Sequence, residues 1–152
     1  MKKFFKALAV VAALAVASTG LVSCSNDDDD DTVVIDERVS VSTSTVKATY
    51  TGSFTDEDSA VPVSVTVYFY DDSKYKVDDS FVLGTVLYYE TQFSGTYTGD
   101  PTTDGTITLT SYQKYEDGEK DGSEQTIARP LTVKDGKMKW WGEYSDVELT
   151  RQ

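Results

Sequence analysis

From Thr45 onward, apolar and polar residues alternate along most of the chain, in segments rich in Val, Thr, Tyr and Phe. Gly, Asp and Pro residues interrupt these segments at short intervals. A period of two places every second side chain on the same face of a β-strand, and no stretch after residue 24 keeps a helical period long enough to compete. The pattern therefore predicts an all-β domain, with strands within 45–55, 61–70, 85–99, 105–112 and 129–141.

The alternation also predicts which side chains point into the core, because the residues between them are Thr, Ser, Glu and Gln. Nine aromatic residues fall on these inward faces, which is much bulk for so short a domain. We therefore expect a barrel interior filled by its own side chains. The inward set is Val46, Ala48, Tyr50, Gly52, Phe54, Val63, Val65, Val67, Phe69, Tyr75, Phe81, Leu87, Tyr89, Thr91, Phe93, Gly95, Tyr97, Ile107, Leu109 and Trp140.

The clearest hairpin is "RPLTVKDGKMKWW", in which Asp135-Gly136 is a strong signal for a two-residue type I′ turn. Such a turn sets Val133 opposite Met138 and Leu131 opposite Trp140, so that all four side chains share one face. The residues that point inward have even numbers at Met138 and Trp140 but odd numbers at Val147 and Leu149. One extra residue is needed, and we expect a β-bulge near Gly142.

Strands joined in sequence by short turns, without crossover helices, favour an antiparallel up-and-down meander closed into a small barrel. The phrases "FYDDSKYKV", "FSGTYTGDPTTDGTITLT" and "PLTVKDGKMKW", with the ending "VELTR", resemble those of small bacterial lipocalin-like lipoproteins over residues 45–151. The Gly-x-Trp that opens eukaryotic lipocalins is absent. The alternative is an immunoglobulin-like β-sandwich, which lacks its disulfide and central-strand tryptophan here.

The N-terminal segment has the layout of a secretory signal. Three lysines precede an apolar stretch of 11 residues, Ala7–Ala17, which is shorter than the roughly 20 residues that cross a bilayer. The following "LVSC", residues 21–24, resembles the lipobox of bacterial lipoproteins. The resemblance implies that residues 1–23 are a cleaved signal peptide and that Cys24 becomes the lipid-modified N-terminus. An ordinary signal peptide is the alternative.

Five consecutive aspartates, Asp27–Asp31, follow the only cysteine. Blocks of like charge stay solvated, so residues 24–44 are expected to form the lipidated cysteine and a flexible acidic tether, in which "TVVIDERVSVS" adds an edge strand or remains loose. The β-barrel domain then covers residues 45–152. Acidic residues directly after the acylated cysteine also resemble the signal that sends some Gram-negative lipoproteins from the outer membrane to the cell surface. A spacer on the periplasmic face is the alternative.

Composition narrows the function classes. Cleavage before Cys24 would leave 129 of the 152 residues and would remove three of the 14 basic residues, changing the net charge from −12 to −15. Nucleic acid and anionic lipid are bound mainly through Lys and Arg, so neither is an expected partner of this surface. The chain has no histidine, which excludes Ser-His-Asp and Cys-His catalysis and the commonest zinc ligand.

Acid-rich stretches are the candidate cation sites. In "YEDGEKDGSEQ", residues 115–125, four residues match EF-hand positions one, three, five and six, but Ala128 occupies position twelve, where a glutamate is required. A solvated hairpin tip is the alternative that we favour, and we expect no metal, no cofactor and no catalytic residues. Acids are so abundant that no carboxylate pair singles out a glycosidase. The four matching residues are Asp117, Glu119, Asp121 and Gly122.

Outward aromatic residues are the candidate binding surface, because exposed aromatic patches mark interfaces or sugar platforms. Trp141 is the leading residue, and surface decoration is the alternative. The sequence thus predicts a non-enzymatic, lipid-anchored outer-membrane protein whose binding module meets a neutral glycan or a basic protein. A periplasmic lipocalin-like carrier and a glycan hydrolase are the competing functions. The candidate surface comprises Trp141, Tyr68, Tyr70, Tyr88 and Tyr112.

Overall fold

The computed structural model describes residues 32–56, 59–141 and 147–152. These residues form nine strands in one sheet, in the spatial order β7-β6-β5-β4-β3-β2-β9-β8, with β1 paired to β5 outside this path. No helix in the described part of the chain has the length and apolar character to cross a bilayer. The strands are β1 (Val33–Glu37), β2 (Val46–Thr55), β3 (Pro62–Tyr70), β4 (Lys74–Leu83), β5 (Val86–Thr98), β6 (Gly105–Glu116), β7 (Glu119–Val133), β8 (Lys137–Lys139) and β9 (Glu148–Arg151).

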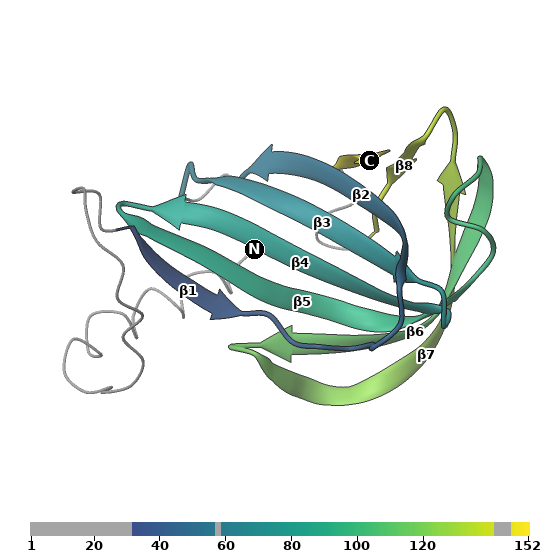
Figure 1. Cartoon of the computed structure of the whole chain (residues 1–152), viewed down its shortest axis with the longest axis horizontal. Helices are drawn as coiled ribbons and strands as arrows, with labels where there is room; N and C mark the ends of the chain where they lie inside the picture. Colours follow the sequence, from purple (N-terminus) through teal and green to yellow (C-terminus); the bar gives the residue numbers. More distant parts are fainter. Residues whose placement is uncertain (1–31, 57–58, 142–146) are drawn as a thin grey trace.

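The sheet curls into a half-barrel (Figure 1). Strands β2 to β7 pair in sequence order, each antiparallel to the next, and β9 then pairs with both β2 and β8. The prediction of an all-β antiparallel meander forming a small lipocalin-like barrel is confirmed. The sandwich alternative is not observed, because one continuous sheet contains all the described strands.

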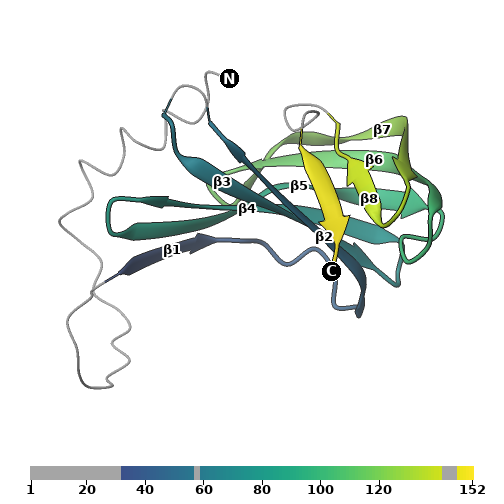
Figure 2. The ribbon, with the colours of Figure 1, turned by 90° about the horizontal axis from the view of Figure 1, so that it is seen from above.

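β1 is the exception to the antiparallel pattern. It lies within residues 24–44, and it pairs in parallel with the first half of β5, from Val33 opposite Val86 to Glu37 opposite Glu90. Of the two alternatives for this segment, the structure shows the edge strand. Strands β1, β4 and β5 extend away from the end of the barrel at which β8 lies (Figures 1 and 2).

The core lies on the concave face and is rich in aromatic rings. The ring of Phe69 contacts Tyr50 and Tyr97, at centroid distances of 5.8 and 4.9 Å, and Tyr75 meets Trp140 at 5.9 Å. The buried tyrosine hydroxyls donate to backbone carbonyls: Tyr50 to Pro101 at 2.6 Å, Tyr75 to Ser111 at 3.0 Å and Tyr97 to Tyr70 at 2.8 Å. Burial of these polar tips is therefore compensated within the fold.

The predicted turn between β7 and β8 is confirmed. The backbones of Lys134 and Lys137 exchange two hydrogen bonds of 2.9 Å around Asp135 and Gly136, whose φ angles of 54° and 71° are those of a type I′ turn. Leu131, Val133, Met138 and Trp140 are all buried, as predicted, but among the described residues β7 and β8 share only the bridge between Lys134 and Lys137, and β8 pairs with β9. The bulge expected near Gly142 lies outside the described residues.

A β-bulge in β5 corrects part of the predicted inward set. Val77 pairs with Phe93 but Asp78 pairs with Thr91, so Gln92 is the extra residue. Because of this extra residue, the β5 side chains before Gln92 point to the faces opposite to those that strict alternation from Phe93 predicts. Three β5 residues predicted to point inward therefore lie on the outer face, where they pair with Val82, Ser80 and Asp78 of β4. Tyr88, which was predicted to point outward, instead pairs with core-facing Phe81. The residues moved to the outer face are Leu87, Tyr89 and Thr91.

Candidate functional site: an aromatic cluster and a buried polar network

Three aromatic rings from separate parts of the chain meet beside the core. The ring of Tyr112 on β6 lies 5.5 Å from Phe93 on β5 and 5.5 Å from Trp141, which follows β8. Phe93 and Trp141 are partly buried and pack against the core. We call Phe93, Tyr112 and Trp141 the aromatic cluster.

Trp141 also carries the cluster's polar features. The guanidinium carbon of Arg129 lies 5.3 Å from the centre of the Trp141 ring, within the range of a cation–π contact. The indole Nε1 is buried, and it has no hydrogen-bond partner within residues 32–56, 59–141 and 147–152. A buried donor without an acceptor is costly, because it loses its hydrogen bond to water without gaining another.

The prediction that Trp141 and Tyr112 point outward is wrong. β8 ends at Lys139, so strand alternation no longer governs Trp141, which instead turns toward the core. The register of β6 against β5 shifts between Leu109 and Gln113, where four steps along β6 match three steps along β5. This shift changes the parity of the residues that follow, and it brings Tyr112 beside Phe93.

The other candidate aromatic residues lie elsewhere. Tyr68 and Tyr70 alternate with the buried Val67 and Phe69, so both lie on the outer face as predicted. The ammonium of Lys76 lies 5.2 Å from the centre of the Tyr68 ring, and a flat ligand would have to displace it to stack there. Tyr88 stacks against Phe81 near the start of β5, at 4.9 Å. The structure therefore brings together only Trp141 and Tyr112 of the five candidates.

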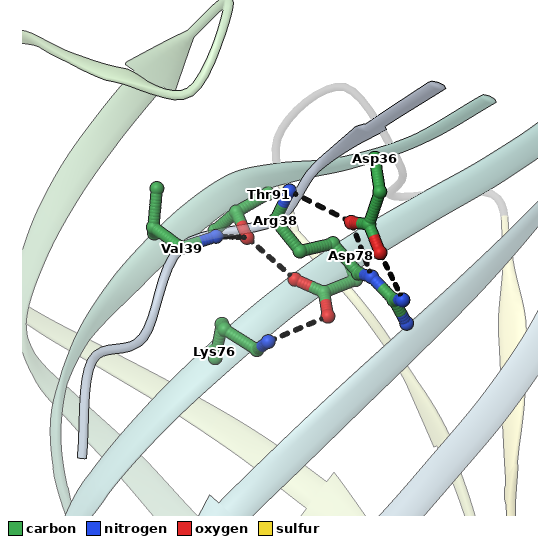
Figure 3. Close-up of polar contacts among 6 residues, drawn as sticks. All are labelled: Asp36, Arg38, Val39, Lys76, Asp78 and Thr91. Carbon is green, nitrogen blue, oxygen red and sulfur yellow. Dashed lines mark hydrogen bonds and ion pairs between the residues drawn. The ribbon is translucent and has the colours of Figure 1, made fainter. Parts of the chain in front are cut away.

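A polar network that the sequence did not predict lies on the outer face, where the segment after β1 crosses β4 and β5 (Figure 3). The Asp78 carboxylate accepts a hydrogen bond from the Thr91 hydroxyl at 2.8 Å and forms an ion pair with Lys76 at 2.7 Å. The Thr91 hydroxyl oxygen in turn accepts the backbone N–H of Val39 at 2.9 Å. This chain of contacts fixes the crossing segment to the sheet.

The pKa values of Asp78 and Asp36 are shifted in opposite directions. Asp78 is only 5 % exposed, and loss of solvation raises its pKa, although the hydrogen bond from Lys76 opposes the shift. By contrast, the Arg38 guanidinium donates to the exposed Asp36 carboxylate and lowers its pKa to about 2. Arg38 also lies 4.4 Å from the centre of the Tyr89 ring. These contacts hold the segment after β1 against the sheet.

Acidic side chains gather where β1, β5 and the β6–β7 turn meet. Glu90 lies directly opposite Glu37 on β1 and opposite Asp79 on β4. The pKa of Glu90 is raised to about 7, mainly by burial and also by the charges of Glu37 and Asp117. Burial and Asp117 also raise the pKa of Glu37. Like charges that face one another across strands are destabilising, so this junction is held together against electrostatic repulsion.

The stretch with EF-hand spacing forms the β6–β7 hairpin. Asp117 and Gly118 occupy a two-residue turn with φ angles of 53° and 74°, and Glu116 pairs with Glu119 across it. Asp121 lies on β7 and forms an ion pair with Lys114 at 3.0 Å. No group of three acidic, His or Cys side chains in the described part of the chain is placed to hold a metal ion. Cys24 lies outside the described residues.

Comparisons with known proteins identify no relative of this chain. No protein-family model matches the sequence, and neither the curated proteins nor the solved structures contain a significant match.

Proposed function

We propose that the chain is a lipid-anchored cell-envelope protein that presents a non-enzymatic β-barrel module for binding a neutral glycan. The anchor rests on the signal-like N-terminus and the lipobox-like "LVSC" that ends at Cys24. The acidic run after Cys24 supports display at the cell surface of a Gram-negative bacterium, rather than at the periplasmic face of the outer membrane. Two or more acyl chains on one cysteine suffice for stable anchoring.

The observation that carries the binding function is the indole N–H of Trp141 within the aromatic cluster, which has no hydrogen-bond partner among the described residues. Sugars present apolar C–H faces for stacking and hydroxyl oxygens for hydrogen bonds, and the cluster offers rings, this donor and the guanidinium of Arg129. A neutral ligand suits a chain of strongly negative charge.

A lipocalin-like carrier has less support. Such a carrier needs an interior cavity of roughly 300 Å³ or more. In this fold, the rings of Tyr50, Phe69, Tyr75, Tyr97 and Trp140 contact one another at the centre of the core. Recognition at the aromatic cluster fits this packing better than enclosure of a ligand.

Trp141 variants test the binding function. Trp141→Phe keeps a ring against the core but removes the indole N–H, so we expect it to weaken binding to an array of neutral oligosaccharides about tenfold, the scale of one good hydrogen bond. Trp141→Ala should weaken binding further and should also lower stability by about 1–3 kcal/mol, because the ring is partly buried.

The matched control is Tyr68→Phe, which changes an outer-face aromatic residue remote from the aromatic cluster and should bind as the native protein does. Binding of the same oligosaccharides by native protein and by folded Trp141→Phe with equal affinity would refute the site. Failure of the native protein to bind any of the oligosaccharides would refute the ligand class.

A further inference from the structure

β1 has an open edge. Within the described part of the chain it pairs only with β5, and the Val33 N–H donates to the Thr85 carbonyl at 3.1 Å. In a parallel ladder the backbone groups of successive residues point alternately to the two sides of the strand. The N–H and C=O groups of Val34 and Asp36 therefore point away from β5, toward the side on which no described strand pairs with β1.

Apolar rows on both faces of the sheet end at this edge. On the outer face, Val34 pairs with Leu87, which in turn pairs with Val82, and Val34 and Val82 are 56 % and 54 % exposed. A groove of about 310 Å³ lies beside this row, between Pro62, Ser64, Ser80, Phe81, Val82 and Leu87. An exposed apolar row beside an unpaired edge is a template for a further strand.

A second row crosses the inner face. It runs from Ile35 through Tyr88 and Phe81 to the buried Val63, with each residue opposite the next in the strand register. A strand added beside β1 would extend both rows, since its successive side chains alternate between the two faces. The edge therefore fits a segment with apolar residues at adjacent positions, one for each row.

The charge around the edge is negative. Glu37, Glu90 and Asp117 lie at the C-terminal end of β1, and the position of a Cβ on Gly118 would be 3.4 Å from the Glu37 carbonyl oxygen, which places the β6–β7 turn there. Asp27–Asp31 precede β1 in the sequence. An incoming segment with basic residues at its ends would therefore be attracted, whereas a second β1 would bring two acidic sets together.

We propose that the open edge of β1 docks an extended, basic-flanked segment of another protein, which adds to the sheet as a further strand. Main-chain hydrogen bonds from Val34 and Asp36 would supply affinity, and the two apolar rows would select the side chains at the centre of the segment. This proposal does not depend on the lipid anchor or on the glycan site. It assigns a distinct surface and a peptide ligand.

The test uses the full chain in detergent and a fluorescent peptide, Lys-Thr-Val-Ile-Val-Thr-Lys, blocked at both ends. Val34→Pro removes an edge-facing N–H without removing a bond to β5, and proline is tolerated at such edge positions. We expect it to weaken peptide binding at least tenfold, whereas the matched Val34→Thr, which keeps the N–H, should weaken binding less than Val34→Pro does. Replacing both peptide lysines by glutamate should also abolish binding.

Hydrogen exchange separates an edge effect from misfolding. In the native protein the peptide should slow exchange of the Val34 and Asp36 amides, while the Val33 amide, which already bonds to β5, should change little. Undiminished binding by Val34→Pro would overturn the proposal, as would equal binding of the glutamate peptide or unchanged exchange at Val34 and Asp36. A dimer of the native chain that Val34→Pro dissociates would also overturn it, because the edge would then belong to a second copy.

Discussion

At the scale of single residues, Glu90 lies in an unfavourable environment. Its carboxyl group is largely buried, and it faces Glu37 from β1, Asp79 from β4 and Asp117 from the β6–β7 turn. Its pKa of about 7 in the folded chain is well above the ordinary value of 4.5. Because the folded state binds this proton more tightly, the stabilisation from protonated Glu90 is complete below about pH 4.5 and is lost as the pH rises through 7.

Glu90→Gln should therefore make the protein more stable at pH 8 by up to about 3 kcal/mol, the value of a shift of two to three pKa units. It should also flatten the fall in unfolding free energy between pH 5 and pH 7. Urea denaturation at several pH values measures both effects. The exposed Glu124→Gln is the control and should change neither. A pH profile that is the same for Glu90→Gln and the native chain would show that Glu90 is not the titrating group.

At the scale of elements, glycine allows β5 and β6 to pair irregularly. A Cβ on Gly95 would lie 2.1 Å from the carbonyl oxygen of Ser111 and 2.8 Å from the ring of Tyr75. The Tyr75 ring lies across this position to donate its hydroxyl to that same carbonyl. The glycine thus lets a core ring cross the backbone at the point where the β5–β6 register shifts.

Gly95→Ala should cost about 2–3 kcal/mol of unfolding free energy, because both obstacles are packed and neither is a flexible chain end. Gly84→Ala is the informative control. Gly84 has a φ of 63° but open space around it, so alanine there should cost only about 1 kcal/mol. Chemical denaturation of both variants compares the two costs, and a Gly95→Ala variant no less stable than Gly84→Ala would contradict the packing described here.

The strands themselves were predictable wherever the alternation was unbroken. Val63, Val65, Val67 and Phe69 are buried, and the Asp135-Gly136 turn has the expected form. The orientation of the residues around the bulges was not predictable. The extra residue at Gln92 places Tyr88 and Tyr89 each on the face opposite to the one predicted for it. Nothing in a period-two pattern marks where such a residue is inserted.

The candidate site was predictable in its residue types but not in its assembly. Parity gives a face within one strand, whereas the meeting of Phe93, Tyr112 and Trp141 depends on the register shift between β5 and β6 and on the end of β8. The polar network around Asp78 depends on the segment after β1, which crosses strands distant in sequence. Long-range contacts of this kind leave no local signal.

At the scale of the whole molecule, the proposed lipid attachment site and the sheet are close together in the sequence. Val33 opens β1 only nine positions after Cys24, and an extended chain of that length spans about 30 Å. A lipid on Cys24 would therefore keep the β-domain near the bilayer surface. After the proposed cleavage before Cys24, the net charge of −15 would repel the domain from anionic lipid, so the aromatic cluster and the β1 edge would remain accessible.

The most direct test of lipid anchoring is mass spectrometry of the mature N-terminus, with the full chain expressed in a Gram-negative host. We predict that the N-terminal peptide of the membrane-bound protein begins at Cys24 and carries the added mass of acyl chains, and that Cys24→Ala abolishes this modification and the membrane association. An unmodified Cys24, or an N-terminus at any other residue, would contradict the account.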